Sequence, residues 1–290
     1  MNTKRMILSI VLVLAVIAGL TLPQARTTVL AEDIQVLTIE DKTFYETLKN
    51  SLNKYDQMAL QNTDDEKQQI TLDMEKVTVI EMGLYQSTVD DNFKNTLETL
   101  FCECTNLEYL KLKKCNLNGI DLSVLDNKKN LRNLSLVECQ LDKVPDLTLP
   151  NLETMCLSRN NLSADGACDS LTRDRFPAVT RLWLNDCQLS DISFLQYMGN
   201  LTSLSLADNR LTDDSISTLI GMENLFDLQE LNLGVKIHIV VGGTYTYNIY
   251  TPSGNTFTDL EGLASLLVHF SDLKELELSG LQILYCFLYD

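Results

Sequence analysis

The sequence predicts an α/β solenoid, with a curved parallel sheet on its concave face and helices or turns on its convex face. Three observations predict it: an apolar spacing that recurs in segments such as "NLEYLKLKKCNLNGI", a small residue at a fixed place after each segment, and helical spacing between the segments. Each segment alternates apolar and polar residues with period two, which is typical of a short strand with one buried face. One strand cannot bury that face alone, so stacked coils are expected.

The recurring segments share the register L-x-x-L-x-L, with valine or methionine at single positions. The copies begin at Leu107, Leu131, Leu152, Val179, Leu201 and Leu228. A weaker copy begins at Val77 and a late one at Leu273. The intervals between the main copies are in the low to high twenties, which is the range of leucine-rich repeats. The sequence therefore predicts a leucine-rich repeat solenoid.

A fixed interior position follows each strand and holds cysteine or asparagine. It is occupied by Cys115, Cys139, Asn160, Cys187 and Asn209. The chain turns inward there and buries backbone groups, which an asparagine amide can satisfy because it both donates and accepts. A thiol fits the same slot with weaker hydrogen bonds, so these cysteines are expected to pack rather than react. The eight cysteines of the chain predict neither a full disulfide framework nor a zinc site.

The first residues have the pattern of a secretory signal peptide, predicted at 1–31. Lys4 and Arg5 precede an apolar run, and small residues precede the expected cleavage site. An uncleaved anchor helix is the alternative, but the apolar run is short for a membrane span. The mature protein is therefore expected to be secreted or associated with the cell surface, and not to remain in a membrane.

The remaining chain divides into two predicted parts. Residues 32–75 are expected to form a helical N-terminal cap, because an uncovered end of a stacked array would expose its core. Residues 76–290 are expected to form the leucine-rich repeat domain. A β-hairpin inserted at about 235–258 interrupts it, because two β-rich runs flank the turn Gly242-Gly243 there.

Composition excludes several classes of function. The chain has 23 basic and 40 acidic residues, a net charge of −17, and this balance repels nucleic acid and anionic membrane surfaces. It has only two histidines, His238 and His269, and neither is expected near a nucleophile. No phosphate-binding or calcium-binding loop pattern is found in the sequence. We therefore expect no catalysis, no cofactor and no metal site.

The repeats, together with "VLTIEDKTFYETLKNSL" and "QITLDMEKVTVIEM" ahead of them, resemble the secreted leucine-rich repeat proteins of Gram-positive bacteria, in the manner of the internalins. The repeat resemblance covers most of 77–283, and a looser resemblance of the cap covers 33–82. The resemblance implies a curved solenoid, export, and binding of protein ligands on the concave sheet. This chain departs from that pattern in its variable repeat lengths and its frequent interior cysteines.

The repeat register predicts which side chains point outward from the concave face, since they flank the strand leucines. The candidate ligand-binding residues are Trp183, Arg181, Tyr109, Lys111, Lys113 and Asn185. Trp183 is the only tryptophan of the chain, and Lys111 is expected about 14 Å from it across three strand steps. Such a basic–aromatic patch has the residue types that most often dominate interfaces. Tyr245 and Tyr247 of the hairpin are further candidates, unless that side of the hairpin packs on the solenoid.

Two functions remain open from the sequence. The first is a secreted, non-catalytic binding protein that holds a protein ligand, rather than a glycan, on the concave face. The alternative is a structural or assembly protein of the cell surface that self-associates through its apolar C-terminal end, "LQILYCFLYD".

Overall fold

The computed structural model describes residues 34–86, 90–234, 238–242, 245–249 and 254–278. The signal peptide expected at 1–31 and the apolar C-terminal end at 281–290 lie outside these residues. Up to the middle of the chain, the elements are β1 (Ile34–Thr38), α2 (Lys42–Tyr55), β2 (Leu60–Asp64), β3 (Gln69–Asp73), η1 (Met74–Lys76), β4 (Val79–Gln86), α3 (Asp91–Glu103), β5 (Tyr109–Cys115), η2 (Leu122–Leu125) and β6 (Asn133–Val137). After these come β7 (Thr154–Cys156), β8 (Arg181–Trp183), η3 (Ser193–Tyr197), β9 (Ser203–Ser205), α4 (Asp213–Ile220), η4 (Glu223–Leu225), β10 (Glu230–Asn232), β11 (His238–Gly242), β12 (Tyr245–Ile249), α5 (Leu260–His269) and β13 (Glu275–Glu277).

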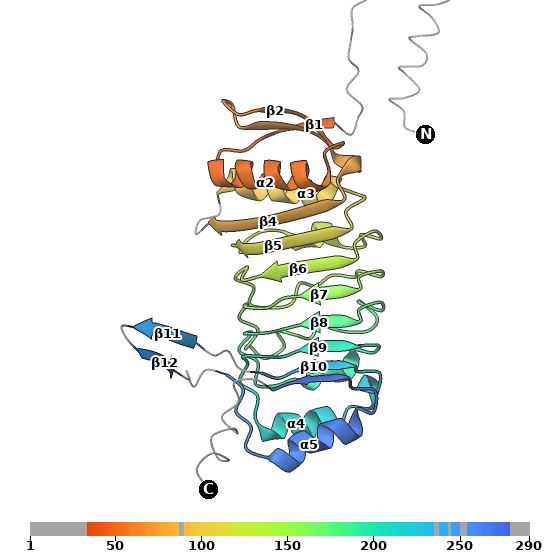
Figure 1. Cartoon of the computed structure of the whole chain (residues 1–290). Coiled ribbons are helices and arrows are strands. Elements are labelled where there is room, and N and C mark those ends of the chain that lie inside the picture. Colours follow the sequence, from red (N-terminus) through yellow and green to blue (C-terminus); the bar gives the residue numbers. More distant parts are fainter. Residues whose placement is uncertain (1–33, 87–89, 235–237, 243–244, 250–253, 279–290) are drawn as a thin grey trace, which may run out of the picture. The chain divides into compact units, whose positions relative to one another are not determined.

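An eight-stranded sheet carries the repeats, with the strand order β13-β10-β9-β8-β7-β6-β5-β4 (Figure 1). All seven neighbouring pairs are parallel. Each coil thus adds one strand beside the strand of the preceding coil. Helices or 3₁₀ turns connect most successive strands, whereas loops without a helix join β6 to β7 and β7 to β8. This confirms the predicted leucine-rich repeat solenoid.

The strand leucines form the core that holds the coils together. Leu110, Leu134, Leu182 and Leu204 occupy equivalent positions on their strands, with Met155 in the same row. All five side chains are at most 1% exposed. Burial of a large apolar side chain stabilises the fold by about 1.5–3 kcal/mol. Because each coil contributes equivalent residues, the core is continuous along the stack of coils, and no single coil has a core of its own.

Asparagines at the interior position tie neighbouring coils together. The Asn160 side-chain oxygen accepts hydrogen bonds from the amides of Cys139 (2.9 Å) and Leu141 (3.0 Å). Its Nδ2 donates to the carbonyls of Leu136 and Leu157, both at 2.7 Å. One buried side chain therefore satisfies four backbone groups that would otherwise lack partners.

Cysteines at the interior position satisfy the backbone differently. The Leu117 amide donates to the backbone carbonyl of Cys139 in the following coil (3.1 Å). In the same way, the Leu162 amide donates to the backbone carbonyl of Cys187 in its following coil (3.0 Å). The thiol of Cys139 donates weakly to the carbonyls of Val137 (3.4 Å) and Leu112 (3.6 Å). A backbone oxygen thus replaces the amide oxygen that cysteine lacks.

The hairpin of β11 and β12 falls between a repeat strand and the interior residue of the same coil. The two strands pair antiparallel, as a separate two-stranded sheet. Strand β10 lies before the hairpin, and Asn255 follows it. Nδ2 of Asn255 donates to the carbonyls of Leu206 (2.9 Å) and Leu233 (3.0 Å), and its oxygen accepts from the Leu211 amide (3.1 Å). Asn255 therefore occupies the interior position of this coil, which sequence reasoning did not assign.

The segment expected to be a helical cap also contains a sheet. Helix α2 is capped by Asp41, whose side chain accepts from the Phe44 amide, and it buries Phe44 and Leu48. Strands β1, β3 and β2 form a three-stranded antiparallel sheet beside it in sequence. The helical expectation was incomplete because Ile70 and Leu72, both fully buried, alternate with polar residues and so follow the period of a strand.

Candidate functional site on the concave face

The solvent-facing side of the eight-stranded sheet, here called the concave face, carries the predicted site residues. The strand pairing aligns one row across it, which runs through Lys111, Ser135, Cys156, Trp183, Ser205, Asn232 and Glu277. A neighbouring row runs through Tyr109, Asn133, Thr154, Arg181, Ser203, Glu230 and Glu275. Three strand steps separate Trp183 from Lys111 in one direction and from Glu277 in the other.

Trp183 projects from a floor of small side chains. It is 38% exposed, and its neighbours on the adjacent strands are Cys156 and Ser205, each 8% exposed. Several other outward-facing positions are also buried, although repeat register alone would expose them: Ser135, Thr154, Ser158 and Ser203. Short side chains on a closely spaced parallel sheet are covered by their longer neighbours. This arrangement leaves the face of the Trp183 ring as the main apolar feature of the central strands.

Arg181 and Asn185 are near Trp183 in sequence, but they make contacts within the sheet. The Arg181 guanidinium donates to Oγ1 of Thr154 at 3.5 Å, toward the N-terminal strands. The Asn185 side-chain oxygen accepts from Ser205 Oγ (2.6 Å) and from the Ala207 amide (3.0 Å). Asn185 therefore links β8 to the next coil, and its oxygen is already engaged, which the sequence pattern did not reveal.

Lys111 belongs to a charge network at the N-terminal end of the face. Its Nζ lies 2.8 Å from Oε1 of Glu81, and Lys54 lies 3.8 Å from the same carboxylate. Tyr55 also donates a hydrogen bond to Glu81. The hydrogen bond from Lys111, followed by that from Tyr55, lowers the pKa of Glu81 below its usual range. Glu81 therefore largely neutralises the positive charge of Lys111, and the expected basic patch is weaker there.

The other predicted residues differ in how far the structure describes them. Tyr109 is 47% exposed, and Lys113 is exposed four residues later on β5. Tyr245 and Tyr247 lie on β12, whose backbone is described. Their side chains lie outside the described residues, so the candidate hairpin contacts stay a prediction.

A hollow of about 240 Å³ opens on the C-terminal side of Trp183. It is lined by Trp183, Ser203, Leu204, Ser205, Glu230, Leu231, Asn232, Glu275 and Glu277. The carboxylates come from β10 and β13, two strands that pair in parallel with Glu230 opposite Glu275. This acidic hollow was not assigned as a site from the sequence. Its signal was present as glutamates at outward repeat positions, but only strand pairing brings them beside the tryptophan.

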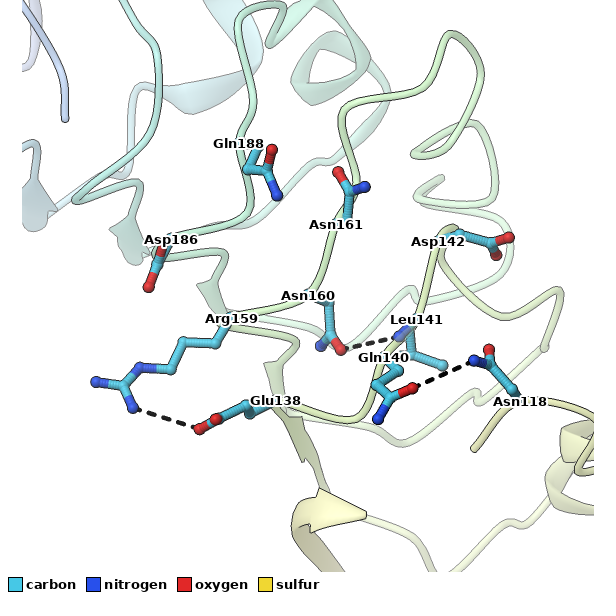
Figure 2. Close-up of a pocket in the computed structure, with 10 residues that line it drawn as sticks. All are labelled: Asn118, Glu138, Gln140, Leu141, Asp142, Arg159, Asn160, Asn161, Asp186 and Gln188. Atoms are coloured by element: carbon cyan, nitrogen blue, oxygen red, sulfur yellow. Dashed lines mark hydrogen bonds and ion pairs between the residues drawn. The ribbon is translucent and has the colours of Figure 1, made fainter. Parts of the chain in front are cut away.

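A larger hollow of about 740 Å³ lies along the loops that follow β6, β7 and β8 (Figure 2). Its lining is polar and includes Glu138, Arg159 and Asp186, all with positive φ angles between 55° and 62°. Arg159 lies 3.5 Å from Glu138, and Asn118 donates to the Gln140 side chain at 3.4 Å (Figure 2). Much of this lining is thus paired with itself, and no aromatic side chain contributes to it.

The interior cysteines have the environment of packing groups. Burial raises the pKa of the Cys139 thiol to about 12, and it raises that of Cys187 to about 12 as well. Since the thiolate is the reactive form, these thiols are almost entirely protonated and unreactive at neutral pH. The seven described cysteines are all unpaired, and Cys286 lies outside the described residues.

The described residues hold neither a cluster of metal ligands nor a membrane-spanning helix. No group of three or more histidine, cysteine, aspartate or glutamate side chains in this part of the chain is arranged to hold a metal ion. Among the same residues, no helix combines the length and the apolar character needed to cross a membrane.

The chain is similar to several solved structures of leucine-rich repeat proteins. An internalin (inlF) from Listeria monocytogenes matches with 20% identity and a TM-score of 0.46, over 84% of this chain and 71% of that one. An internalin C2 (inlC2) from the same species matches with 17% identity and a TM-score of 0.38, over 84% of this chain and 77% of that one.

A plant structure is also similar. It is the ectodomain of the membrane receptor kinase GASSHO1/SCHENGEN3 from Arabidopsis thaliana, in complex with CASPARIAN STRIP INTEGRITY FACTOR 2. The identity is 17% and the TM-score 0.41, over 71% of this chain but only 22% of that one. No protein-family model and no curated protein matches the chain. The expected similarity to internalins is thus found among solved structures, and the fold assignment itself rests on the eight-stranded parallel sheet.

Proposed function

We propose that this protein is a secreted, non-catalytic binding protein that holds a protein ligand on its concave face. The observation that carries the proposal is the position of Trp183, an exposed ring above a floor of small, buried side chains. Tryptophan, tyrosine and arginine contribute most to protein interfaces, and Tyr109 and Arg181 lie on the same face. A large aromatic ring held on a rigid sheet costs little conformational entropy when it binds.

The chemistry near this face supports binding rather than catalysis. The His269 ring packs against Phe226 and Phe270, at centroid distances of 5.6 and 4.8 Å, on the helical side of the coils. The thiol of Cys156, next to Trp183, is 92% buried. Neither group is placed as a nucleophile or a base in the hollow, where an enzyme would need both in hydrogen-bonding reach.

A matched pair of aromatic substitutions tests the proposal. Tyr197 is 58% exposed in the 3₁₀ turn η3, away from the concave face, and it serves as the control for Trp183. Proteins captured from culture or host material by the wild type are identified, and their affinity is then measured for Trp183→Ala and Tyr197→Ala. We expect Trp183→Ala to weaken binding by about tenfold or more and Tyr197→Ala to leave it unchanged. Equal binding by Trp183→Ala would overturn the proposal.

A further inference from the structure

We infer that the acidic hollow beside Trp183 receives an arginine side chain of the protein partner. This inference rests on the proposed function and specifies the chemistry of the same face. The hollow combines three features: an aromatic wall, adjacent carboxylates and a serine hydroxyl on its floor. These features come from different strands of the sheet, and together they are complementary to a planar cation such as a guanidinium group.

The carboxylates give the hollow its charge preference. Glu230 and Glu275 lie opposite each other on β10 and β13, and both are exposed. Among the described residues, no lysine or arginine forms an ion pair with either of them. Arg181 lies in their row, but its guanidinium is turned toward Thr154 on the other side. Two neighbouring carboxylates without a cation favour a positively charged ligand group.

The floor of the hollow supplies a polar contact that nothing in the described chain uses. Ser203 lines the hollow and is only 6% exposed, and its hydroxyl has no hydrogen-bond partner among the described residues. The oxygen itself is not shut off from solvent, so it is open to a donor of a ligand. A guanidinium N–H that enters the hollow would donate to this hydroxyl oxygen in place of water.

Trp183 forms the wall of the hollow against which a flat cation stacks. Two strand steps separate β8 from β10, so the backbones of Trp183 and Asn232, which share a row, are about 10 Å apart, and Glu230 lies two residues before Asn232. Arginine stacks on tryptophan through its planar guanidinium while its N–H groups reach carboxylates, and lysine cannot do both. The volume of about 240 Å³ is below the roughly 300–1,000 Å³ of small-molecule sites, so it suits a single side chain.

The test follows the indole N–H resonance of the only tryptophan during titration of the full chain. The probes are N-acetyl-arginine methylamide and its neutral analogue, the citrulline derivative, with the lysine derivative as a third ligand. We expect saturable shifts with arginine at a Kd on the order of millimolar, as befits one side chain. We expect at least about fivefold weaker binding of lysine and no saturation with citrulline.

Two double variants with equal changes of net charge complete the test. Glu230→Gln/Glu275→Gln removes the charge of the hollow, and we expect it to weaken arginine binding by about fivefold or more. Glu223→Gln/Glu261→Gln changes η4 and α5 instead and should bind as the wild type does. Equal binding of citrulline, or unchanged binding by the first variant, overturns the inference. The proposed function is judged separately, by the loss of partner binding in Trp183→Ala.

Discussion

The two ends of the eight-stranded sheet meet the same structural needs with different residues. At the N-terminal end, cysteine fills the interior position, and the surface cation Lys111 is paired with Glu81. At the C-terminal end, Asn209 fills the interior position, and Glu230 and Glu275 face solvent without a cation among the described residues. The fold therefore specifies how backbone groups are satisfied and how outward side chains align in rows, but it does not specify surface charge. We therefore expect a positively charged ligand to bind most favourably at the C-terminal end, where the two carboxylates lack a cation in the described part of the chain.

The largest expected effect concerns the interior of the C-terminal end. The oxygen of Asn209 accepts from the amides of Cys187 (3.0 Å) and Leu189 (3.1 Å), and Nδ2 donates to the carbonyls of Leu184 and Leu206, both at 2.8 Å. Asn209→Ala leaves these buried groups without partners, so we expect the free energy of unfolding to fall by about 3 kcal/mol or more. Urea denaturation followed by circular dichroism measures this loss.

Cys139→Ala is the matched control from the N-terminal end. The Leu117 amide donates to the backbone carbonyl of Cys139, which the substitution keeps, and only two weak thiol contacts and a small volume are lost. We expect the free energy of unfolding to fall by about 1 kcal/mol. If Cys139→Ala lowered the free energy of unfolding as much as Asn209→Ala does, this would contradict the claim that asparagine satisfies the backbone with its side chain and cysteine with its own backbone carbonyl.

A smaller effect is expected at the N-terminal surface, where stability should depend on pH through Glu81. Lys111 and Tyr55 lower the pKa of Glu81 in the folded protein. A carboxyl with a lowered folded pKa stabilises the fold above its unfolded pKa and loses that contribution as pH falls through the folded value. The side chain is 34% exposed, so solvent screening limits the contribution to about 0.5 kcal/mol.

The measurement compares Glu81→Gln with the wild type by thermal unfolding at pH 7 and pH 3. We expect the variant to be slightly less stable at pH 7, and the difference to shrink at pH 3 and at high salt. Stability of Glu81→Gln equal to that of the wild type at pH 7 would show that the network at Lys111 contributes nothing to the fold.

Much of the fold could be predicted from the sequence because leucine spacing determines strand register. Once the copies are aligned, Lys111, Cys156 and Trp183 must fall in one row, and the strand pairing has them there. Asn255 was missed because the inserted hairpin separates it from β10, so no local spacing identifies it. The strands of the N-terminal segment were missed because each is only five residues long, so the period-two run at Ile70 gives a weaker signal than the amphipathic helix α2.

The candidate site was harder to predict than the fold. Repeat position shows that a side chain points outward, but it does not show what that side chain contacts. Glu81 lies directly opposite Lys111 on the neighbouring strand β4, and it was missed because the outward positions of the weaker first copy were not assigned. Asn185 is outward by position, yet it is engaged with Ser205 in the next coil. The acidic hollow depends on the pairing of β10 with β13 across the insertion.

The central claim is that Trp183 stands open to solvent beside the carboxylates of Glu230 and Glu275. Collisional quenching of its fluorescence by caesium and by iodide tests this directly, because Trp183 is the only tryptophan. We expect the ratio of caesium quenching to iodide quenching to be about twofold or more higher for Trp183 than for a free indole. We also expect Glu230→Gln/Glu275→Gln to reduce this ratio more than Glu223→Gln/Glu261→Gln does. The account would be contradicted if neither ion quenched the emission of Trp183, as for a shielded ring. It would also be contradicted if iodide quenched as efficiently as caesium.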